Sequence, residues 1–436
     1  MLNAKYVIIG NSIAAVHAVE AIRERDKYGS IILISDENCH VYSRPLISYY
    51  LGEKVKADQM DYRPASFYSD HNVKAILGQR AVSLDSQSKT VVLEDQTRIR
   101  FEKLLLTTGG SPFIPDIPGR EMQGIFSFTT IEDADCLREF IKNHNTRRAV
   151  VLGGGLIGLK ATEALIALNI QVTIVELADR ILSATFDLTA SRIIEKALNM
   201  VGCSIITGNT VKEFIEGEDG RVGAVLLKDD SRIETDLVII AIGVHPRVDL
   251  AKGTDIKVGR GILVDRFLQT TVKDIYAAGD VVECFDFIMN TNRPVAILPN
   301  ASKQGRISGH NMAGGEKIYE GCMAMNSVEL AGIPTISAGL TDPALLSDKN
   351  RGKNIEVLQE LLEERGTYKK VIIEGNRIIG VILIGNIDRA GIYTGLIKDR
   401  VDISSFKDHL LKDDFGLLSL PREYRKHLVT GQGIEV

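Results

Sequence analysis

The stretch AVVLGGGLIGLKATEALIALNIQVTIVE, residues 149–176, decides the fold. It begins with a short apolar run, turns through glycines into a segment with helical periodicity, and ends in a second apolar run. This order predicts a strand, a tight turn, a helix and a parallel strand. Gly153, Gly155 and Gly158 have the G-x-G-x-x-G spacing, in which small residues permit the turn, the approach of a pyrophosphate and the packing of helix on strand.

An acidic residue, Glu176, ends the second strand of this segment. A carboxylate at that place binds the ribose of a dinucleotide and favours an unphosphorylated 2′-hydroxyl, so NADH is expected over NADPH. The NAD contacts expected in this segment are Gly153, Gly155, Ile157, Gly158 and Glu176.

A second strand–turn–helix–strand pattern lies in residues 6–36. Its turn has the relaxed spacing G-x-S-x-x-A, formed by Gly10, Ser12 and Ala15, and its second strand ends at Asp36. A phosphate there would meet free N–H groups at a helix N-terminus. We therefore expect a second dinucleotide, with Asp36 binding ribose hydroxyls. One such turn is weak evidence, but the same context found twice is strong.

Short apolar strands alternate with amphipathic helices along most of the chain, which predicts an α/β fold with two Rossmann-like domains. We expect a discontinuous first domain in residues 1–115 and 246–325, and a second domain in residues 116–245. Residues 326–436 are expected to form an α+β domain. In it, the stretch 371–385 has the pattern of a hairpin, and charged helical stretches are expected to flank that hairpin.

Composition narrows the class of protein. The 436 residues are 44% hydrophobic and 25% charged with a net charge of −5, which is typical of a globular protein and gives no basic footprint for nucleic acid. No apolar run approaches the roughly 20 residues that span a bilayer. The N-terminal stretch enters a strand directly and does not resemble a secretory signal, so a cytoplasmic protein is expected. The cysteines have no metal-ligand spacing, and no metal site is expected.

Two dinucleotide sites in one chain imply two redox carriers. In such a protein a nicotinamide passes a hydride to a flavin, while the protein positions the rings and tunes their electrostatics. The chain indeed resembles the FAD-dependent pyridine nucleotide oxidoreductases of the glutathione-reductase fold. It is most similar to the branch that holds rubredoxin reductases, ferredoxin reductases and the flavin part of NADH-dependent nitrite reductases.

Five further stretches carry this resemblance, and together with the turns they cover nearly the whole chain: LLLTTGGSPFIPDIPG (104–119), LVIIAIGVHPRVDL (237–250), TTVKDIYAAGDVVE (270–283), ILPNASKQGRISGHNMAG (297–314) and VYSRPLISYYL (41–51). The first two resemble the links between the FAD and NAD domains. The resemblance implies FAD contacts at Arg44, Pro45, Val82, Thr108, Gly109, Asp280 and Leu298, and an NAD contact at Gly243. By this likeness Asp280 binds the ribityl chain, and the helix that begins near Leu298 points its N-terminus at the flavin.

The chain departs from the thiol-dependent members of the family. Disulfide reductases of this fold carry a cysteine pair in the first FAD helix, and related enzymes carry one cysteine after the second strand. Here the corresponding stretch is Tyr42–Pro45, and Cys39 lies nearby but displaced. We interpret Cys39 as a plain thiol, so that electrons leave directly from the flavin.

A second departure concerns charge. Ferredoxin reductases of this branch pair a lysine of the flavin loop with a glutamate on the NAD-domain helix, whereas this chain has Tyr49 and Lys160 at those positions. We hypothesise that Lys160, with Tyr49, lies near the flavin–nicotinamide junction and supports hydride transfer. The alternative is a solvated lysine on the helix. No arginine stands near Thr129, where many members contact the FAD phosphates.

The resulting expectation is an FAD-dependent enzyme that moves electrons between NADH and an iron–sulfur or rubredoxin-type protein, in either direction. One alternative is an NADH oxidase or peroxidase, and another is a flavin-bearing binding subunit without catalysis. The chain could also be the NAD-reducing subunit of a larger complex or a homodimer. The segment 406–429 is a docking element or packs on its own domain; its roughly helical apolar spacing favours packing.

Overall fold

A computed structural model of the chain describes residues 1–345, 354–421 and 425. The chain forms two compact units. The first comprises Met1–Leu177 and Cys203–Cys322, and the second comprises Ala178–Gly202 and Met323–Val436.

The first unit contains a seven-stranded sheet in the order β3-β2-β1-β6-β5-β4, with β18 also paired to β6. Strands β1, β2, β3, β6 and β18 run parallel, while β5 pairs antiparallel with both β4 and β6. Strand β2, the end of β1 and the end of β6 are apolar and buried, because both faces of a parallel sheet are covered there. The strands are β1 (Leu2–Ile9), β2 (Ile31–Ile34), β3 (Val73–Ile76), β4 (Ala81–Asp85), β5 (Thr90–Leu93), β6 (Arg98–Leu106) and β18 (Ile275–Ala277).

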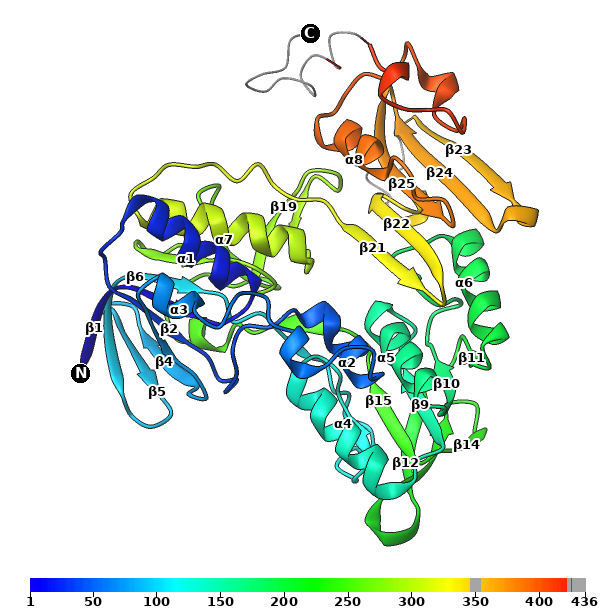
Figure 1. Cartoon of the computed structure of the whole chain (residues 1–436), viewed down its shortest axis with the longest axis horizontal. Coiled ribbons are helices and arrows are strands. Elements are labelled where there is room, and N and C mark those ends of the chain that lie inside the picture. The colour runs from blue at the N-terminus through cyan, green and yellow to red at the C-terminus, as the bar shows by residue number, and fades with distance from the viewer. Residues whose placement is uncertain (346–353, 422–424, 426–436) are drawn as a thin grey trace. The chain divides into compact units, whose positions relative to one another are not determined.

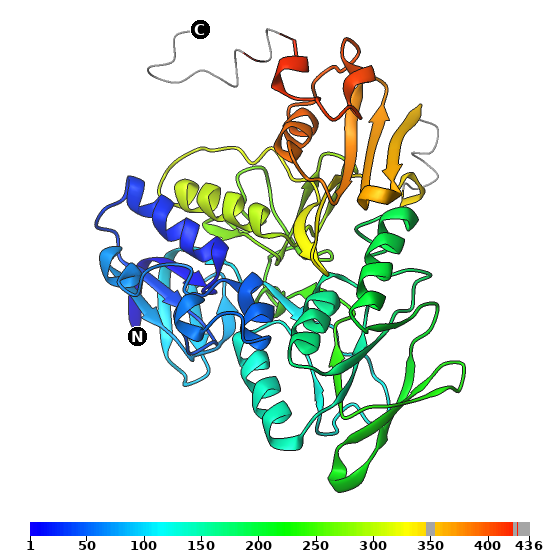
Figure 2. The ribbon, with the colours of Figure 1, turned by 45° about the vertical axis from the view of Figure 1, so that its right-hand side comes forward.

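Two helices, α1 (Ile13–Arg25) and α7 (Leu298–Met312), lie side by side on this sheet in both ribbon views (Figures 1 and 2). Their backbones approach closely because α7 has glycines four residues apart on one face. A Cβ at Gly305 would lie 2.1 Å from the carbonyl oxygen of Ala14, and one at Gly309 would lie 2.3 Å from that of Ala18. This contact joins segments that are almost 300 positions apart in the sequence.

A second parallel sheet has the order β11-β10-β9-β15-β8 and includes both strands of the segment 149–176. Helix α5 (Leu156–Ala167) connects β9 to β10, as predicted, and α4 (Ile131–His144) precedes β9. A three-stranded antiparallel sheet of β12, β13 and β14 follows β11. The strands are β8 (Ile125–Phe126), β9 (Arg148–Leu152), β10 (Gln171–Val175), β11 (Ser204–Ile206), β12 (Val211–Glu216), β13 (Val222–Leu227), β14 (Arg232–Glu234) and β15 (Leu237–Ile240).

The chain passes between the two large sheets twice, and the two passages pair with each other. Strand β7 (Gly110–Pro112) leads toward the second sheet, and β16 (Val244–Pro246) returns antiparallel beside it. The rest of the first unit includes α2 (Ile47–Leu51), α3 (Phe67–Asp70), β17 (Ile262–Leu263), β19 (Val282–Asp286) and β20 (Thr291–Arg293).

The second unit is built on an antiparallel sheet in the order β21-β22-β25-β24-β23, together with α6 (Leu188–Met200) and α8 (Ala390–Lys398). Strands β24 and β25 form the predicted hairpin. The expected helical stretch before the hairpin was wrong, because residues 355–362 form an edge strand. Their apolar residues recur at intervals that also fit a helix, but pairing with β24 decides the structure. The strands are β21 (Met325–Leu330), β22 (Ile333–Gly339), β23 (Ile355–Leu362), β24 (Thr367–Glu374) and β25 (Arg377–Ile384).

The described part of the C-terminal segment, residues 406–421, packs on its own unit in short turns rather than as a long helix. Phe406, Leu410 and Phe415 are buried, and the Phe415 ring contacts that of Tyr393 with 5.1 Å between centroids. Of the predicted segment 406–429, positions 422–424 and 426–429 lie outside the described residues. No helix in the described ranges is both long and apolar enough to cross a bilayer.

Candidate functional site

The first glycine turn joins β1 to α1. Gly10 has a φ of +119°, and a Cβ there would lie 2.2 Å from the carbonyl oxygen of Thr107, so only glycine fits. Ser12 precedes α1 with extended backbone, and its side chain makes no capping bond to the helix in the described structure. Ala15 is fully buried, where a larger side chain would push the helix off the sheet. The first N–H groups of α1 are therefore available to an anion.

The turn that follows β18, at Gly279 and Asp280, packs against the start of α1. Gly279 has a φ of +84°, and a Cβ there would lie 3.4 Å from Cβ of Ala14 and 3.8 Å from Cβ of Ala301. The next residue is Asp280, whose carboxyl has a raised pKa because burial outweighs the attraction of the Arg44 guanidinium. A half-buried carboxylate that has no hydrogen bond within the described residues would be stabilised by a hydroxyl-bearing ligand. This position fits the ribityl chain of a flavin.

Three other predicted FAD contacts lie at irregular points of the backbone. Val82 is the extra residue of a bulge between β4 and β5, so it is not paired in the ladder. Leu298 is the first residue of α7, followed by Pro299, and the first turn of that helix has no acidic side chain. Pro45 belongs to the short 3-10 turn that leads into α2. A residue unpaired in its ladder and a helix start without an acidic side chain are places where a ligand can approach the backbone.

The carboxylate that ends β2 has an unexpected partner. Arg247 Nη1 donates to Asp36 Oδ2 at 2.8 Å, while Arg247 Nε donates to Ser111 Oγ at 2.9 Å. The backbone of Arg247 is bonded to Thr108 and Gly109, at 2.7 Å and 2.9 Å. The Asp36 side chain is still 44% exposed, so it can also bind ribose hydroxyls. Arg247 was not predicted as a site residue, although it lies within the predicted return link, residues 237–250.

Arg44 is held by a network rather than standing alone at the surface. It forms an ion pair with Glu37 and donates to the carbonyl oxygen of Thr129 at 3.0 Å. The Tyr42 hydroxyl donates to Glu37 at 2.7 Å and accepts the N–H of Ile131 at 3.1 Å. The network thus ties the flavin loop to the N-terminus of α4. Neither Glu37 nor Tyr42 was predicted as a contact; Tyr42 lies within the matching stretch 41–51, whereas Glu37 directly follows Asp36 and lies outside the matching stretches.

The second glycine turn, between β9 and α5, has three glycines with three different surroundings. Gly153 has a φ of +110°, and a Cβ there would lie 2.4 Å from the carbonyl oxygen of Ala241. A Cβ at Gly158 would lie 2.0 Å from the carbonyl oxygen of Gly153. At Gly155 a Cβ would meet no described atom within 4 Å. The open side of Gly155, where Ile157 is half-buried in the first helical turn, is where a pyrophosphate can approach.

The acid at the end of β10 faces this turn. Glu176 Oε2 accepts the N–H of Gly154 at 2.6 Å, which places the carboxylate beside the glycines. Gly243, after β15, has a φ of +119°, and a Cβ there would meet no described atom within 4 Å. The Glu176 carboxylate at this place beside the glycine turn fits the unphosphorylated ribose of NADH.

The two residues predicted to lie at the flavin–nicotinamide junction do lie together. Lys160 Nζ is 4.8 Å from the centre of the Tyr49 ring, a cation–π distance. Lys160 also forms an ion pair with Glu163, and both side chains are about four-fifths buried, at 20% and 19% exposure. Helix α2 comes close to α5 here because Gly52 has no side chain: its Cβ would lie 3.3 Å from Cα of Ala164. The solvated alternative for Lys160 therefore does not describe its surroundings.

The thiol next to the flavin loop is not activated. Burial raises the pKa of Cys39 to about 11, and its carbonyl oxygen accepts a weak bond from Asn11 Nδ2 at 3.3 Å. A thiol with this pKa stays protonated at neutral pH and is a poor nucleophile. No three His, Cys, Asp or Glu side chains among the described residues lie together as a metal site would require.

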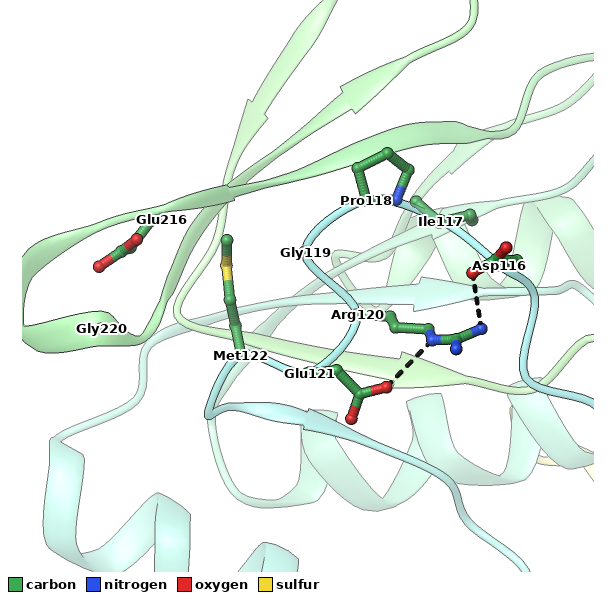
Figure 3. A pocket seen from close by; sticks show the side chains of 9 residues that line it. All are labelled: Asp116, Ile117, Pro118, Gly119, Arg120, Glu121, Met122, Glu216 and Gly220. Carbon is green, nitrogen blue, oxygen red and sulfur yellow. Dashed lines mark hydrogen bonds and ion pairs between the residues drawn. The ribbon is translucent and has the colours of Figure 1, made fainter.

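An open pocket lies on the link between the sheets, and its lining residues include none of the glycines of the two turns (Figure 3). Arg120 lines the pocket, and its guanidinium forms ion pairs with Asp116 and Glu121, each at 3.0 Å. Gly119, with a φ of +85°, lies against Phe214 of β12, because a Cβ would come within 2.5 Å of its carbonyl oxygen. The paired charges make this a structural feature of the link.

Two family models match the chain. Residues 4–305, which include both glycine turns, match the model described as pyridine nucleotide-disulphide oxidoreductase, and residues 325–401 match the rubredoxin NAD+ reductase C-terminal domain. The chain belongs to the pyridine nucleotide-disulphide oxidoreductase family. The resemblance and the α/β fold class inferred from the sequence are thereby confirmed.

Relatives of this oxidoreductase cover most of its length. It is 32% identical over 413 residues to the NADH-dependent phenylglyoxylate dehydrogenase subunit epsilon of Aromatoleum evansii, across 94% of this chain and 95% of that protein. It is 29% identical over 403 residues to the NAD(P)H nitrite reductase of Bacillus subtilis (strain 168), across 91% of this chain but 48% of that protein. The chain thus spans about half the length of that curated relative. Among solved structures, it is similar to putidaredoxin reductase in its covalent complex with putidaredoxin, with a TM-score of 0.83 and 25% identity across 98% and 99% of the two chains.

Oxidoreductases of this family bind FAD and use NAD(H), so both predicted cofactors are confirmed. The residues of the two turns fit these groups, because Gly155 leaves room for a pyrophosphate and Asp280 presents a carboxylate without a hydrogen bond in the described structure. The chain is therefore an NAD(P)H-dependent flavin oxidoreductase by family.

Proposed function

We propose that this oxidoreductase transfers electrons between NADH and an iron–sulfur or rubredoxin-type protein, in either direction. The observation that carries the proposal is the combination of two glycine turns with a flavin loop, residues 41–51, that contains no cysteine. When bound, FAD would accept a hydride from NADH and release electrons singly. A loop without a thiol leaves direct transfer to an acceptor as the remaining route.

We propose the first turn, with Asp36, Asp280 and the start of α7, as the FAD site, and the second turn, with Glu176 and Gly243, as the NAD site. Arg44, Pro45, Val82, Thr108, Gly109 and Leu298 complete the proposed flavin contacts. The N-termini of α1 and α5 would hold the two pyrophosphates. The division into an FAD domain (1–115 and 246–325), an NAD domain (116–245) and a C-terminal domain (326–436) belongs to the same proposal.

Lys160 is proposed as the charged residue of the ring junction. Tyr49 and Glu163 fix its ammonium group from two sides, so its charge has a defined position. A preorganised positive charge favours a developing negative charge nearby without reorganisation during the reaction. Arg44 and its partners would hold the loop that packs on the flavin and exclude water from it.

The acceptor class rests on the C-terminal domain and on relatives. The C-terminal model carries the name of rubredoxin reductase, and the similar solved structure is bound to putidaredoxin. The phenylglyoxylate dehydrogenase subunit, which this chain matches over nearly its full length, supports membership of a larger redox complex. We propose that the protein serves an iron–sulfur or rubredoxin-type partner, alone, as a homodimer or within such a complex.

The proposal is tested by reducing the FAD-loaded protein with NADH without oxygen and then offering ferredoxin, rubredoxin and oxygen separately. We expect NADH to bleach the flavin, and an iron–sulfur or rubredoxin-type protein to restore its colour faster than oxygen does. Faster recovery with oxygen would favour the NADH oxidase alternative and contradict the proposal. Failure of NADH to bleach the flavin would favour a binding subunit.

A further inference from the structure

Two buried thiols lie together within the first unit, outside the proposed cofactor contacts. Sγ of Cys284, in β19, is 3.5 Å from Sγ of Cys322, and both residues are 3% exposed. The N–H of Cys322 donates to the carbonyl oxygen of Phe285 at 2.9 Å, and the N–H of Phe287 donates to the carbonyl oxygen of Cys322 at 3.1 Å. These two bonds hold the backbone of the second thiol beside the strand that carries the first.

Polar groups distinguish the two sulfur atoms. Gln304, which is 1% exposed, donates from Nε2 to Cys284 Sγ at 3.3 Å and to the Tyr319 hydroxyl at 3.1 Å. The hydrogen bond with Cys322 lowers the pKa of Cys284, and the same bond raises the pKa of Cys322. A negative charge shared by the pair therefore resides on Cys284, which makes Cys284 the nucleophile.

The other cysteines of the chain lack these features. Burial raises the pKa of both Cys39 and Cys203 to about 11. Cys136 is exposed, and its pKa is also raised, by partial desolvation and by the carboxylates around it. Among the described residues, no hydrogen bond joins any of these three thiols to a second thiol. Cys284 and Cys322 alone have both a sulfur partner and donors that stabilise a thiolate.

We propose that Cys284 and Cys322 form a reversible dithiol–disulfide couple that is oxidised by hydroperoxides. The Cys284 thiolate attacks the terminal peroxide oxygen and breaks the O–O bond, which gives a sulfenic acid and a hydroxide or alkoxide. That anion takes up the proton that the Cys284 thiol had lost and leaves as water or an alcohol. Cys322 then forms the S–S bond and displaces the hydroxyl group, which leaves as water with the Cys322 proton. The peroxide receives two electrons in total. A small dithiol reverses the reaction by exchange, supplying two electrons and two protons.

The two thiols are linked through Gln304 to the Gly279–Asp280 turn of the proposed flavin site. Gln304 accepts the N–H of Gly279 at Oε1, 2.8 Å away, while its amide nitrogen bonds Cys284. The side chain of Gln304 therefore separates the Cys284 thiol from the Gly279–Asp280 turn and bonds to both. Cys322 is also the last residue of the first unit, so a disulfide would fasten the end of that unit to β19. The couple is a modification site beside the flavin motif and takes no part in the proposed transfer from NADH.

The test uses the FAD-loaded full chain, reduced, freed of reductant without oxygen, and treated with one equivalent of hydrogen peroxide. Thiols are then alkylated after denaturation, and peptides are identified by mass spectrometry. We expect a linked peptide pair that contains Cys284 and Cys322, the loss of two thiols per chain, and recovery of both with dithiothreitol. Bulky alkylating reagents should spare the pair in the folded protein and modify the exposed Cys136.

Variants define the order of the steps. Cys322→Ser should accumulate a sulfenic acid at Cys284 that dimedone traps. Cys284→Ser should lose no thiol pair on treatment with peroxide. Cys136→Ser is the matched control and should behave as the wild type. NADH should bleach the flavin of Cys284→Ser at the wild-type rate, which separates this proposal from the proposed function. Absence of the linked peptide in the wild-type protein, a measurement that needs no variant, would overturn the proposal, as would equal oxidation in Cys284→Ser.

Discussion

Replacing Gly155 by alanine should separate cofactor binding from folding. A Cβ at Gly155 meets no described atom within 4 Å, and the residue has a φ of −80° and a ψ of −179°, which alanine adopts without strain. Alanine reduces the entropy of the unfolded chain, which stabilises by about 0.4–1 kcal/mol, but it is a poorer N-cap by a similar amount. We therefore expect the free energy of unfolding to stay within about 1 kcal/mol of the wild type.

The substitution should instead weaken the binding of the nicotinamide cofactor. A methyl group on the open side of Gly155 keeps a pyrophosphate from the N–H groups of the turn, and one lost hydrogen bond to a charged group costs about 1.5–3 kcal/mol. This corresponds to a rise in Kd of about 10- to 150-fold. Gly158→Ala is the contrast, because its Cβ would lie 2.0 Å from the carbonyl oxygen of Gly153. That clash should lower the free energy of unfolding by about 1–3 kcal/mol.

The assay is calorimetric titration of the oxidised, FAD-loaded protein with NAD+, combined with thermal unfolding followed by circular dichroism. Gly391→Ala is the matched control, since a Cβ there also meets no described atom within 4 Å and the position lies in α8. It should leave the affinity for NAD+ unchanged. An unchanged Kd in Gly155→Ala would refute the assignment of the second turn to the nicotinamide cofactor.

Three further perturbations test other parts of the molecule. Lys160→Ala should slow the reduction of flavin by NADH in stopped-flow by about tenfold, the equivalent of about 1.4 kcal/mol, and Lys160→Arg should restore most of the rate; an unaltered rate would remove Lys160 from the junction. Alkylation of Cys39 should accelerate about tenfold per pH unit up to about pH 11, because burial raises its pKa to about 11 and only the thiolate reacts; a plateau below pH 9 would disagree. Asp187→Ala should destabilise the protein by about 3–5 kcal/mol in urea, because it leaves the buried ammonium of Lys370, now 2.8 Å from the carboxylate, without its ion pair; adding Lys370→Met should recover much of the loss.

The elements that carry the two glycine turns could be predicted because their signals are local. In residues 149–176 the apolar runs, the glycines and the terminal acid stand in a fixed order, and the structure contains β9, α5 and β10 in that order. The positions of Tyr49 and Lys160 were predicted from family motifs, and their contact is present.

The partners that come from distant segments could not be predicted. Arg247 reaches Asp36 across 211 positions, so no local pattern in the sequence joins the two residues. Residues 355–362 show the same limit, since their apolar spacing fits a helix as well as a strand. Pairing with β24, which no local pattern records, decides between the two.

The central claim is that electrons leave the flavin for a protein acceptor without a thiol relay. The most direct measurement is the NADH-dependent reduction of ferredoxin or rubredoxin by Cys39→Ser, without oxygen, compared with the wild-type protein. The account predicts equal rates of flavin bleaching and of acceptor reduction in the two proteins. Retained bleaching with lost acceptor reduction in the variant would contradict it.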